Sequence, residues 1–392
     1  MSTALLGDLV QIRGGGTPDK AVSAYWGGSI PWASVKDFKS TQIVGTMDSI
    51  TPLGVSNSAT NVIAAGALLV PTRMAVGKAA INTIDVAINQ DIKALLPGPR
   101  VDTRYLLHAI LSKAPELERQ ATGATVKGIT LDVLRRVEIP LPPLDEQQRI
   151  AAILDQADAL RRKRREAIRQ LDTLHKSHFE QIFGHPLRNE MGWPVALLGD
   201  LLADIEGGWS PTCLDRPAHD DEWGVLKLGA VTYGRFDDGA NKALPQGVEP
   251  RPKLEVRRGD LLFTRKNTYE LVAACALVRN GRARLLMPDL IFRLQLVDPV
   301  RSHPEFVHAV LSHPAKRAEV QSLASGAAGS MPNISKARLR MVPICLPPPE
   351  LQLQFAEAVE RLELMRSQAV EHLAHLDALF ASLQHRAFRG EL

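Results

Sequence analysis

Residues 140–184 most constrain what this chain can fold into, because a proline-rich entry leads there into one long, charged, helix-favouring run. Pro142 and Pro143 can precede a helix but cannot lie inside one. Asp145 suits an N-cap, and Gly184 suits the end of the helix. About 38 residues at ~1.5 Å each predict a rod of roughly 57 Å. A helix this long and this polar needs a partner helix to cover its apolar side.

The partner lies in the same chain. Apolar and basic residues alternate four and three apart in a heptad seam, and the same pattern returns 205 residues later. The first seam is Ile150, Leu154, Ala157, Arg161, Arg164, Ile168, Leu171, His175, His178 and Ile182, and the second is Phe355, Val359, Leu362, Arg366, Ala369, Leu373, Leu376, Phe380, Leu383 and Ala387. The proline entry and its glutamine, Gln147 and Gln352, recur too. A coiled coil between two chains is the alternative, but a partner in cis favours intramolecular pairing.

The segments before the two helices repeat the same order of motifs, as in Leu6–Leu9 and Leu198–Leu201. Short Val/Ile/Ala-rich runs over residues 61–65, 67–70 and 78–84 predict strands, and 105–112 and 115–121 predict helices. We therefore predict an α+β fold in which two strand-rich globules are separated by two long antiparallel helices, with a pseudo-two-fold relation from tandem duplication. The predicted domains are residues 1–144 and 185–349, and the predicted helices are residues 145–184 and 350–392.

Composition narrows the class of protein. The 392 residues are 45% hydrophobic and 23% charged, which is typical of a globular chain of two or three domains. No apolar run reaches membrane-spanning length, so we expect a cytoplasmic protein with no membrane partner. Cys213, Cys275 and Cys345 fit neither a zinc spacing nor a disulfide framework. The net charge of +4 permits nucleic-acid binding, and 5% aromatic residues disfavour a single-strand stacking platform.

No coherent catalytic set is present. Gly77-Lys78 lacks the earlier glycine and the following hydroxyl of a phosphate-binding loop. The histidine pairs of the two long helices lack further metal ligands at a useful spacing. We expect no catalytic residue and no metal site, which favours a binding or targeting protein.

Basic and amide residues that follow turn signals are the candidate DNA contacts, because Arg and Lys suit guanine edges or phosphate and Asn and Gln suit adenine. The predicted DNA-binding residues are Lys36, Asp37, Arg73, Lys78, Gln90, Lys127, Arg235, Arg265, Lys266, Asn267 and Asn333, with Ser330 in the last of these loops. The run Arg161–Arg165 in the first long helix faces DNA, a partner protein or only solvent; its role stays open.

These features resemble the specificity subunit of a type I restriction–modification system, over essentially the whole chain. The resemblance rests on the turn at residues 14–18, the aromatic segments 25–28 and 30–32, the entry at 139–147 and the duplicated long helices. It implies two target-recognition domains that each read one half of a split, asymmetric site in double-stranded DNA. The helices would set the unread spacer and dock two modification subunits.

The same resemblance places all cofactors outside this chain. The modification subunits would bind S-adenosylmethionine and methylate adenine after base flipping, and restriction subunits would supply ATP- and Mg-dependent translocation and cleavage. Two readings from other classes remain: a stand-alone nuclease of duplicated domains, and a protein–protein spacer without a DNA role. Activity of the purified chain would favour the first, and absence of salt-dependent DNA affinity the second.

Overall fold

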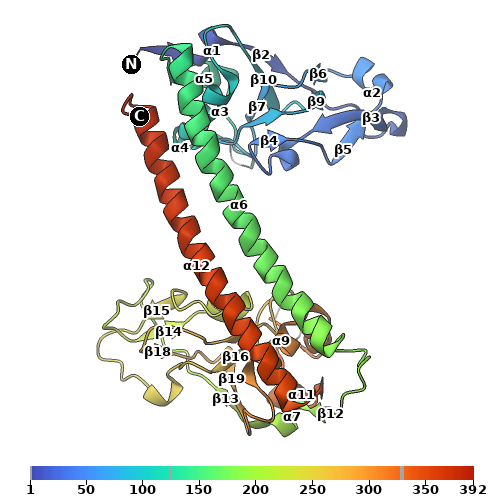
Figure 1. The fold of residues 1–392 in the computed structure, drawn as a ribbon, viewed down its shortest axis with the longest axis vertical. Coiled ribbons are helices and arrows are strands. Elements are labelled where there is room, and N and C mark those ends of the chain that lie inside the picture. Colours follow the sequence, from blue (N-terminus) through green and yellow to red (C-terminus); the bar gives the residue numbers. More distant parts are fainter. Residues whose placement is uncertain (1, 124, 327–330) are drawn as a thin grey trace. The chain divides into compact units, whose positions relative to one another are not determined.

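The fold is described by a computed structural model that covers residues 2–123, 125–326 and 331–392 (Figure 1). The chain divides into two compact units, and each unit contains one half of each long helix. Unit 1 is Met1–Glu166 with Glu371–Leu392, and unit 2 is Ala167–Val370. The predicted domain boundaries at the helix ends stay a prediction. The units divide within the helices because each helix packs on two different cores.

Unit 1 is a strand-rich body with a few short helices. Its elements are β1 (Thr3–Leu5), α1 (Leu6–Leu9), β2 (Val10–Gly14), η1 (Ser23–Tyr25), β3 (Trp26–Ala33), η2 (Val35–Asp37), β4 (Gln42–Ile43), β5 (Asp48–Ile50), α2 (Pro52–Ser56), β6 (Asn61–Ile63), β7 (Leu68–Pro71), β8 (Ala80–Asn82), β9 (Val86–Ile88), β10 (Ile92–Pro97), α3 (Thr103–Ser112), α4 (Ala114–Gln120), α5 (Leu131–Arg135) and β11 (Glu138–Pro140). The described strands form sheets of order β2-β10-β7-β8-β4 and β5-β3-β9-β6, and β1 pairs with β11.

Unit 2 repeats the first of these sheets in its order β13-β19-β16-β17, beside a small sheet β15-β14-β18 and the pair β12-β20. Its elements are β12 (Val195–Leu197), α7 (Leu198–Leu201), β13 (Leu202–Gly207), β14 (Gly224–Leu226), α8 (Gly229–Thr232), β15 (Asn241–Ala243), η3 (Pro252–Leu254), β16 (Leu261–Thr264), β17 (Cys275–Leu277), β18 (Leu285–Leu286), β19 (Ile291–Leu296), α9 (Pro304–Ser312), α10 (Pro314–Ser322), α11 (Lys336–Arg340) and β20 (Pro343–Cys345).

The long helices are α6 (Leu144–Phe183) and α12 (Pro349–Ala387). The prediction of two long helices is confirmed, but α6 begins at Leu144, so Asp145 lies in the first turn and is not the N-cap. An acidic residue there still stabilises the helix, because the first turn presents unpaired N–H groups. Gly184 ends α6 with a φ of +75°, which glycine adopts without a steric cost.

In each unit a segment of α6 lies antiparallel beside a segment of α12 (Figure 1). Every predicted seam position is buried or half-buried. In unit 1, Ile150, Leu154 and Ala387 join the core of the strand-rich body. In unit 2, Phe179 and Phe355 do the same, and their ring centroids are 5.8 Å apart. The seam therefore joins the helices to each other and to the globules.

The glycine turn shows the duplication at the level of single atoms. Gly15 and Gly208 follow β2 and β13, and a Cβ at either would lie 2.0 or 2.1 Å from the carbonyl oxygen of Ile88 or Met287. Only glycine allows the turn to approach the neighbouring backbone this closely. Trp209 in the second copy bonds through its N–H to the Met287 carbonyl as Gly16 does to the Ile88 carbonyl.

Candidate nucleic-acid interface

In unit 1 the predicted DNA-contact residues come from loops that are far apart in the sequence and joined in space. Met74 donates its N–H to the carbonyl of Lys127 at 3.1 Å, and Arg73 pairs with Gly128 in a β-bridge. Lys78 Nζ lies 3.2 Å from the Phe38 carbonyl, which connects this loop to the one that carries Lys36. The loops therefore lie together as one surface.

The glycine turn belongs to the same surface. Thr17 Oγ1 donates a hydrogen bond to Gln90 Oε1, and Gln90 lies beside Asp91. The Asp91 carboxylate is 3.9 Å from the exposed guanidinium of Arg73. We call this set loop surface 1 and define it as Thr17, Lys36, Arg73, Lys78, Gln90 and Lys127. All of its basic side chains are exposed.

Unit 2 builds the corresponding surface from the corresponding loops. Ile334 donates its N–H to the carbonyl of Arg265 at 2.8 Å, and Lys266 pairs with Asn333 in a β-bridge. Ser210 donates to the carboxylate of Asp289, as Thr17 does to Gln90. We call Ser210, Arg265, Lys266, Asp289 and Asn333 loop surface 2. Ser330 lies outside the described residues.

The two surfaces share a frame but differ in chemistry. An amide oxygen accepts the turn hydroxyl in loop surface 1, whereas a carboxylate accepts it in loop surface 2. The Arg265 guanidinium lies 5.2 Å from the Phe292 ring centroid, so this charged group rests on an aromatic residue of β19. The Asn333 side-chain oxygen is buried without a hydrogen-bond partner among the described residues. Two non-identical surfaces on one scaffold are suited to reading two different sequences.

Two predicted contact residues, Asp37 and Asn267, have structural roles. Asp37 is buried and accepts hydrogen bonds from the N–H groups of Ser34 and Met47 at 2.8 and 2.9 Å, so it holds its loop. Asn267 is buried and donates to the Thr232 hydroxyl at 3.3 Å. For both residues a DNA contact stays a prediction, and neither presents an exposed group that would make it.

Arg235 is bound to the long helices of unit 2. Its guanidinium lies 2.7 Å from the carboxylate of Asp172 on α6 and 2.6 Å from that of Glu363 on α12. Both carboxylates would lose their partner if Arg235 contacted phosphate, so we interpret it as a residue that positions its loop on the helices. Sequence reasoning missed this because neither carboxylate is near Arg235 in the sequence.

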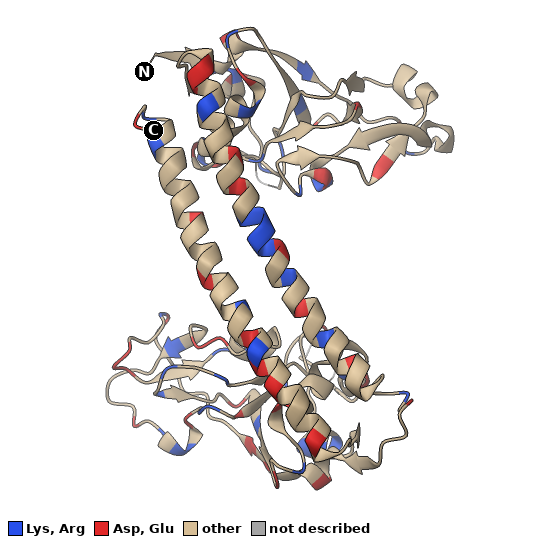
Figure 2. Cartoon of the chain, viewed as in Figure 1, with Lys and Arg blue, Asp and Glu red and all other residues tan. Residues whose placement is uncertain are grey.

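The basic run of α6 is visible as the blue segment in the middle of that helix (Figure 2). Arg161 and Arg165 both reach Asp377 of α12, at 2.6 and 2.9 Å, and Arg162 reaches Asp158 at 3.2 Å. Lys163 is exposed. Two of the five basic residues, Arg161 and Arg165, therefore join the two helices, and Arg162 pairs within α6.

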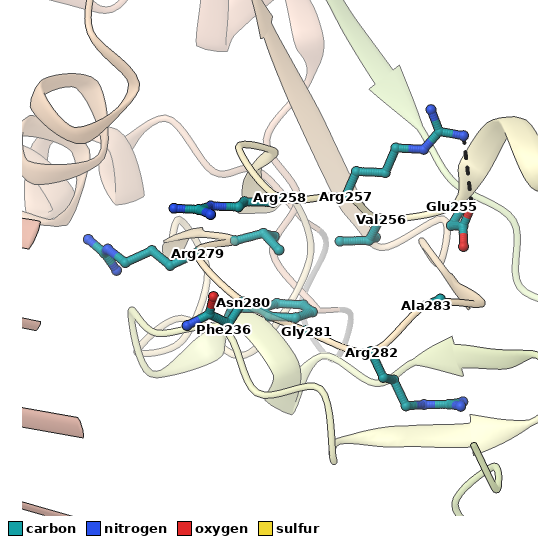
Figure 3. A pocket seen from close by; sticks show the side chains of 11 residues that line it. Phe236, Glu255, Val256, Arg257, Arg258, Arg279, Asn280, Gly281, Arg282 and Ala283 are labelled. Carbon is teal, nitrogen blue, oxygen red and sulfur yellow. Dashed lines mark ion pairs between the residues drawn. The ribbon is translucent and has the colours of Figure 1, made fainter. Parts of the chain in front are cut away.

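Unit 2 also contains a hollow of about 400 Å³ that sequence reasoning did not single out (Figure 3). Four arginines line it: Arg257, Arg258, Arg279 and Arg282. Figure 3 shows Arg258 and Arg279 pointing to the same side, and Arg257 pointing toward Glu255. Arg257 and Arg258 precede β16, whereas Arg265 follows it, so the hollow lies at the other end of the strand from loop surface 2. The adjacent residues Arg257 and Arg258 before Gly259 are the feature of the sequence that could have indicated this hollow.

Among the described residues, no group of three or more His, Cys, Asp or Glu side chains could hold a metal ion. The cysteines are free. Within the same ranges, no helix is both long enough and apolar enough to cross a membrane.

Residues 2–170 match the family model described as the type I restriction modification DNA specificity domain. Two curated relatives from Escherichia coli align with 45% of this chain. They are the specificity subunits of the type I restriction enzymes EcoEI, at 35% identity, and EcoR124I/EcoR124II, at 34% identity. The N-terminal part of the chain is therefore similar to the DNA specificity domain of type I restriction–modification systems. It spans 30% and 45% of the length of those two relatives.

The fold of the whole chain is similar to that of solved S subunits of type I restriction–modification systems. The S subunit of a type I restriction–modification system from M. genitalium aligns over 99% of this chain and 96% of its own length, with a TM-score of 0.61 and 14% identity. A second structure, from work on complex assembly of a type I system, aligns over 100% of this chain with a TM-score of 0.55 and 18% identity. The predicted fold class is confirmed, and residues 2–170 match the predicted family.

Proposed function

We propose that this chain is the DNA-recognition subunit of a type I restriction–modification complex. One observation carries the proposal: the fold presents two loop surfaces on equivalent elements with different side chains. Loop surface 1 would read one half of a split site in double-stranded DNA, and loop surface 2 would read the other half. Exposed Lys and Arg contact phosphate or guanine, and the amide groups contact adenine.

The chain itself would be non-catalytic. Two modification subunits would supply S-adenosylmethionine-dependent methylation of adenine, and restriction or translocase subunits would supply the ATP- and Mg-dependent steps. This division of labour agrees with the relatives, which are named specificity subunits. The complex would act in the cytoplasm, where its DNA is.

Exchange of one globule tests the proposal. Residues 1–139 would be replaced by those of a relative, and methylated adenines would be mapped in a host that carries the modification subunits. We expect one half-site to change while the other half-site and the spacer stay the same. A change in both halves, or no methylation change at all, would contradict the assignment of one half-site to each loop surface.

Experiments on the purified chain test the two alternative functions, a stand-alone nuclease and a protein–protein spacer. The purified chain is expected to leave DNA intact in the presence of Mg²⁺ and to bind duplex DNA with an affinity that falls steeply with salt. Cleavage by the purified chain would favour the nuclease, and an affinity independent of salt and sequence would remove the DNA-reading role.

A further inference from the structure

A second cavity in unit 2, of about 230 Å³, shares no lining residue with loop surface 2 and is lined by arginine, histidine and glutamate side chains. Its walls come from α6, α12, the sheet and α9–α10. Its lining includes His175, Arg235, Arg279, His308, Arg317 and Glu363. We call it the His–Arg pocket. Arg279 also lines the larger hollow of Figure 3, so the two spaces meet at that side chain.

The arginines of the pocket are not equally neutralised. Arg279 makes a bidentate ion pair with Glu305, at 2.7 and 2.6 Å. Arg235 is held by Asp172 and Glu363. Arg317 donates to the backbone carbonyl of Glu270 at 3.0 Å, and within the described residues it meets no carboxylate. Burial lowers the pKa of the Arg317 guanidinium, as expected for a cation taken from water without a counter-ion.

Side chains that line the pocket also carry unused hydrogen-bonding groups. Within the described ranges, Arg317 Nε and His175 Nε2 are buried without a hydrogen-bond partner. His308 is buried, and its Nε2 lies 3.2 Å from the Gly234 carbonyl, so in the neutral ring that nitrogen carries the proton. Buried polar atoms in proteins are nearly always paired. An excess cation and side chains with unpaired nitrogens around one cavity are the features of an anion site.

Unit 1 shows that the scaffold does not require this chemistry. His108 in α3 occupies the position that His308 occupies in α9, and its Nε2 is hydrogen-bonded to the Asp155 carboxylate at 2.8 Å. Phe380 holds the seam position that His175 holds in unit 2, and its ring is 6.2 Å from that of His108. The counterpart of Asp155 in unit 2 is Glu360, which is exposed. Where unit 1 has a carboxylate partner and an apolar ring, unit 2 has a polar cavity.

We propose that the His–Arg pocket binds a phosphate group, held by the Arg317 guanidinium and the His175 ring. Phosphate fits better than carboxylate because it offers more acceptor oxygens to the separate donors of the pocket, and its protonated oxygen can donate to a neutral imidazole. Arginine is also the residue best matched to phosphate geometry. Tyr233 lines the pocket and is 80% exposed, so a base attached to the phosphate would have an aromatic surface at the mouth.

The phosphate could come from free inorganic phosphate, from a nucleotide or from DNA, and the experiment separates these sources. Binding of inorganic phosphate and of adenosine monophosphate to the full chain is measured by calorimetry at constant ionic strength. We expect saturable binding of phosphate in the millimolar range. Tighter binding of adenosine monophosphate that is lost in Tyr233→Ala identifies a nucleotide, and displacement of phosphate by duplex DNA identifies a DNA phosphate.

Arg317→Gln should weaken phosphate binding by about tenfold or more, because it removes a charge-assisted contact. Arg258→Gln is the matched control: this arginine lines the neighbouring hollow only, its side chain is 77% exposed, and its loss should leave phosphate binding unchanged. If Arg317→Gln fails to fold, His175→Phe provides the second test, because phenylalanine is the residue of the equivalent site in unit 1. Absence of phosphate binding by the native chain, or equal binding by these variants, would overturn the proposal.

Discussion

Arg161 Nε of α6 donates to Asp377 Oδ1 of α12 at 2.6 Å. The equivalent positions in the other half of the chain, 205 residues away, are Arg366 on α12 and Asp172 on α6. There the same bond runs in the opposite direction between the helices: Arg366 Nε donates to Asp172 Oδ1 at 2.8 Å. Each carboxylate also accepts from a second arginine, Arg165 for Asp377 and Arg235 for Asp172. The duplication has therefore kept one interhelical ion-pair unit in both halves of the chain.

Asp377→Asn should lower the midpoint of thermal unfolding by roughly 2–4 °C, from a loss of about 1 kcal/mol. The magnitude is small because the Asp377 side chain is 42% exposed and water screens the pair. Differential scanning calorimetry measures the shift. Asp132→Asn is the control, since Asp132 is 76% exposed and pairs only within its own helix, so no shift is expected. An equal shift in both variants would show that the interhelical pair adds nothing.

Gln147→Leu should cost more, about 2–4 kcal/mol, because it leaves buried backbone groups unpaired. Gln147 is fully buried, accepts from the Asp102 N–H at 2.9 Å, and donates to the carbonyls of Arg100 and Pro142. Urea unfolding measures the loss. Gln148→Leu, at the exposed neighbouring position, should be close to neutral. Gln352 makes the same three kinds of bond in unit 2, so Gln352→Leu should repeat the result.

Lys36→Ala and Lys127→Ala should each weaken duplex DNA binding and reduce the slope of log affinity against log salt by about one. Both side chains are exposed on loop surface 1. Arg135→Ala removes an exposed arginine outside that surface and should leave the slope unchanged. Fluorescence anisotropy at several salt concentrations gives both quantities. A slope identical to that of the native chain would remove the tested lysine from the interface.

Acid should destabilise unit 2 through His308. Burial, the nearby Arg279 and His175 lower the pKa of His308 to about 3, against 6.5 for the free side chain. The folded ring stays neutral while the unfolded chain takes up a proton, so stability falls as the pH falls from 6.5 toward 3. Between pH 6.5 and 5 the loss is about 2 kcal/mol at most.

The measurement is denaturant unfolding at several pH values in a buffer without phosphate. His308→Gln should flatten the pH slope of unit 2, whatever its effect on stability at pH 7. His219→Gln, at an exposed position, should leave the slope unchanged. If His308→Gln keeps the full slope, other groups account for the acid sensitivity.

The sequence predicted the elements whose signal is local or periodic. The long helices and their seam followed from heptad spacing and from the match at 205 residues. Strand β3 was missed, because Trp26–Ala33 contains glycines and a proline and has the composition of a turn. The start of α6 was predicted at residue 145, one residue too late, because local propensity does not fix which residue first adopts helical angles.

Roles that depend on distant partners could not be predicted in this way. Lys36 and Lys78 belong to one surface only because the fold places the Phe38 carbonyl beside Lys78. Arg235 has the composition of a DNA contact but meets carboxylates 63 and 128 residues away. The His–Arg pocket combines side chains from both long helices and the sheet, and none of them forms a motif with its sequence neighbours.

Removal of one heptad from each long helix tests whether the helices set the unread spacer of the proposed site. Residues 165–171 and 367–373 are deleted together, because the contacts Arg161–Asp377 and Asp172–Arg366 show that these segments lie opposite each other. Seven residues correspond to about 10 Å of helix, or about three base pairs. We expect methylated-adenine mapping to show both half-sites unchanged and the spacer shorter by about that amount. A deletion of four residues at the same places breaks the heptad register and should instead abolish modification. An unchanged spacer with the paired seven-residue deletion would mean that something other than the helices sets the distance between the half-sites.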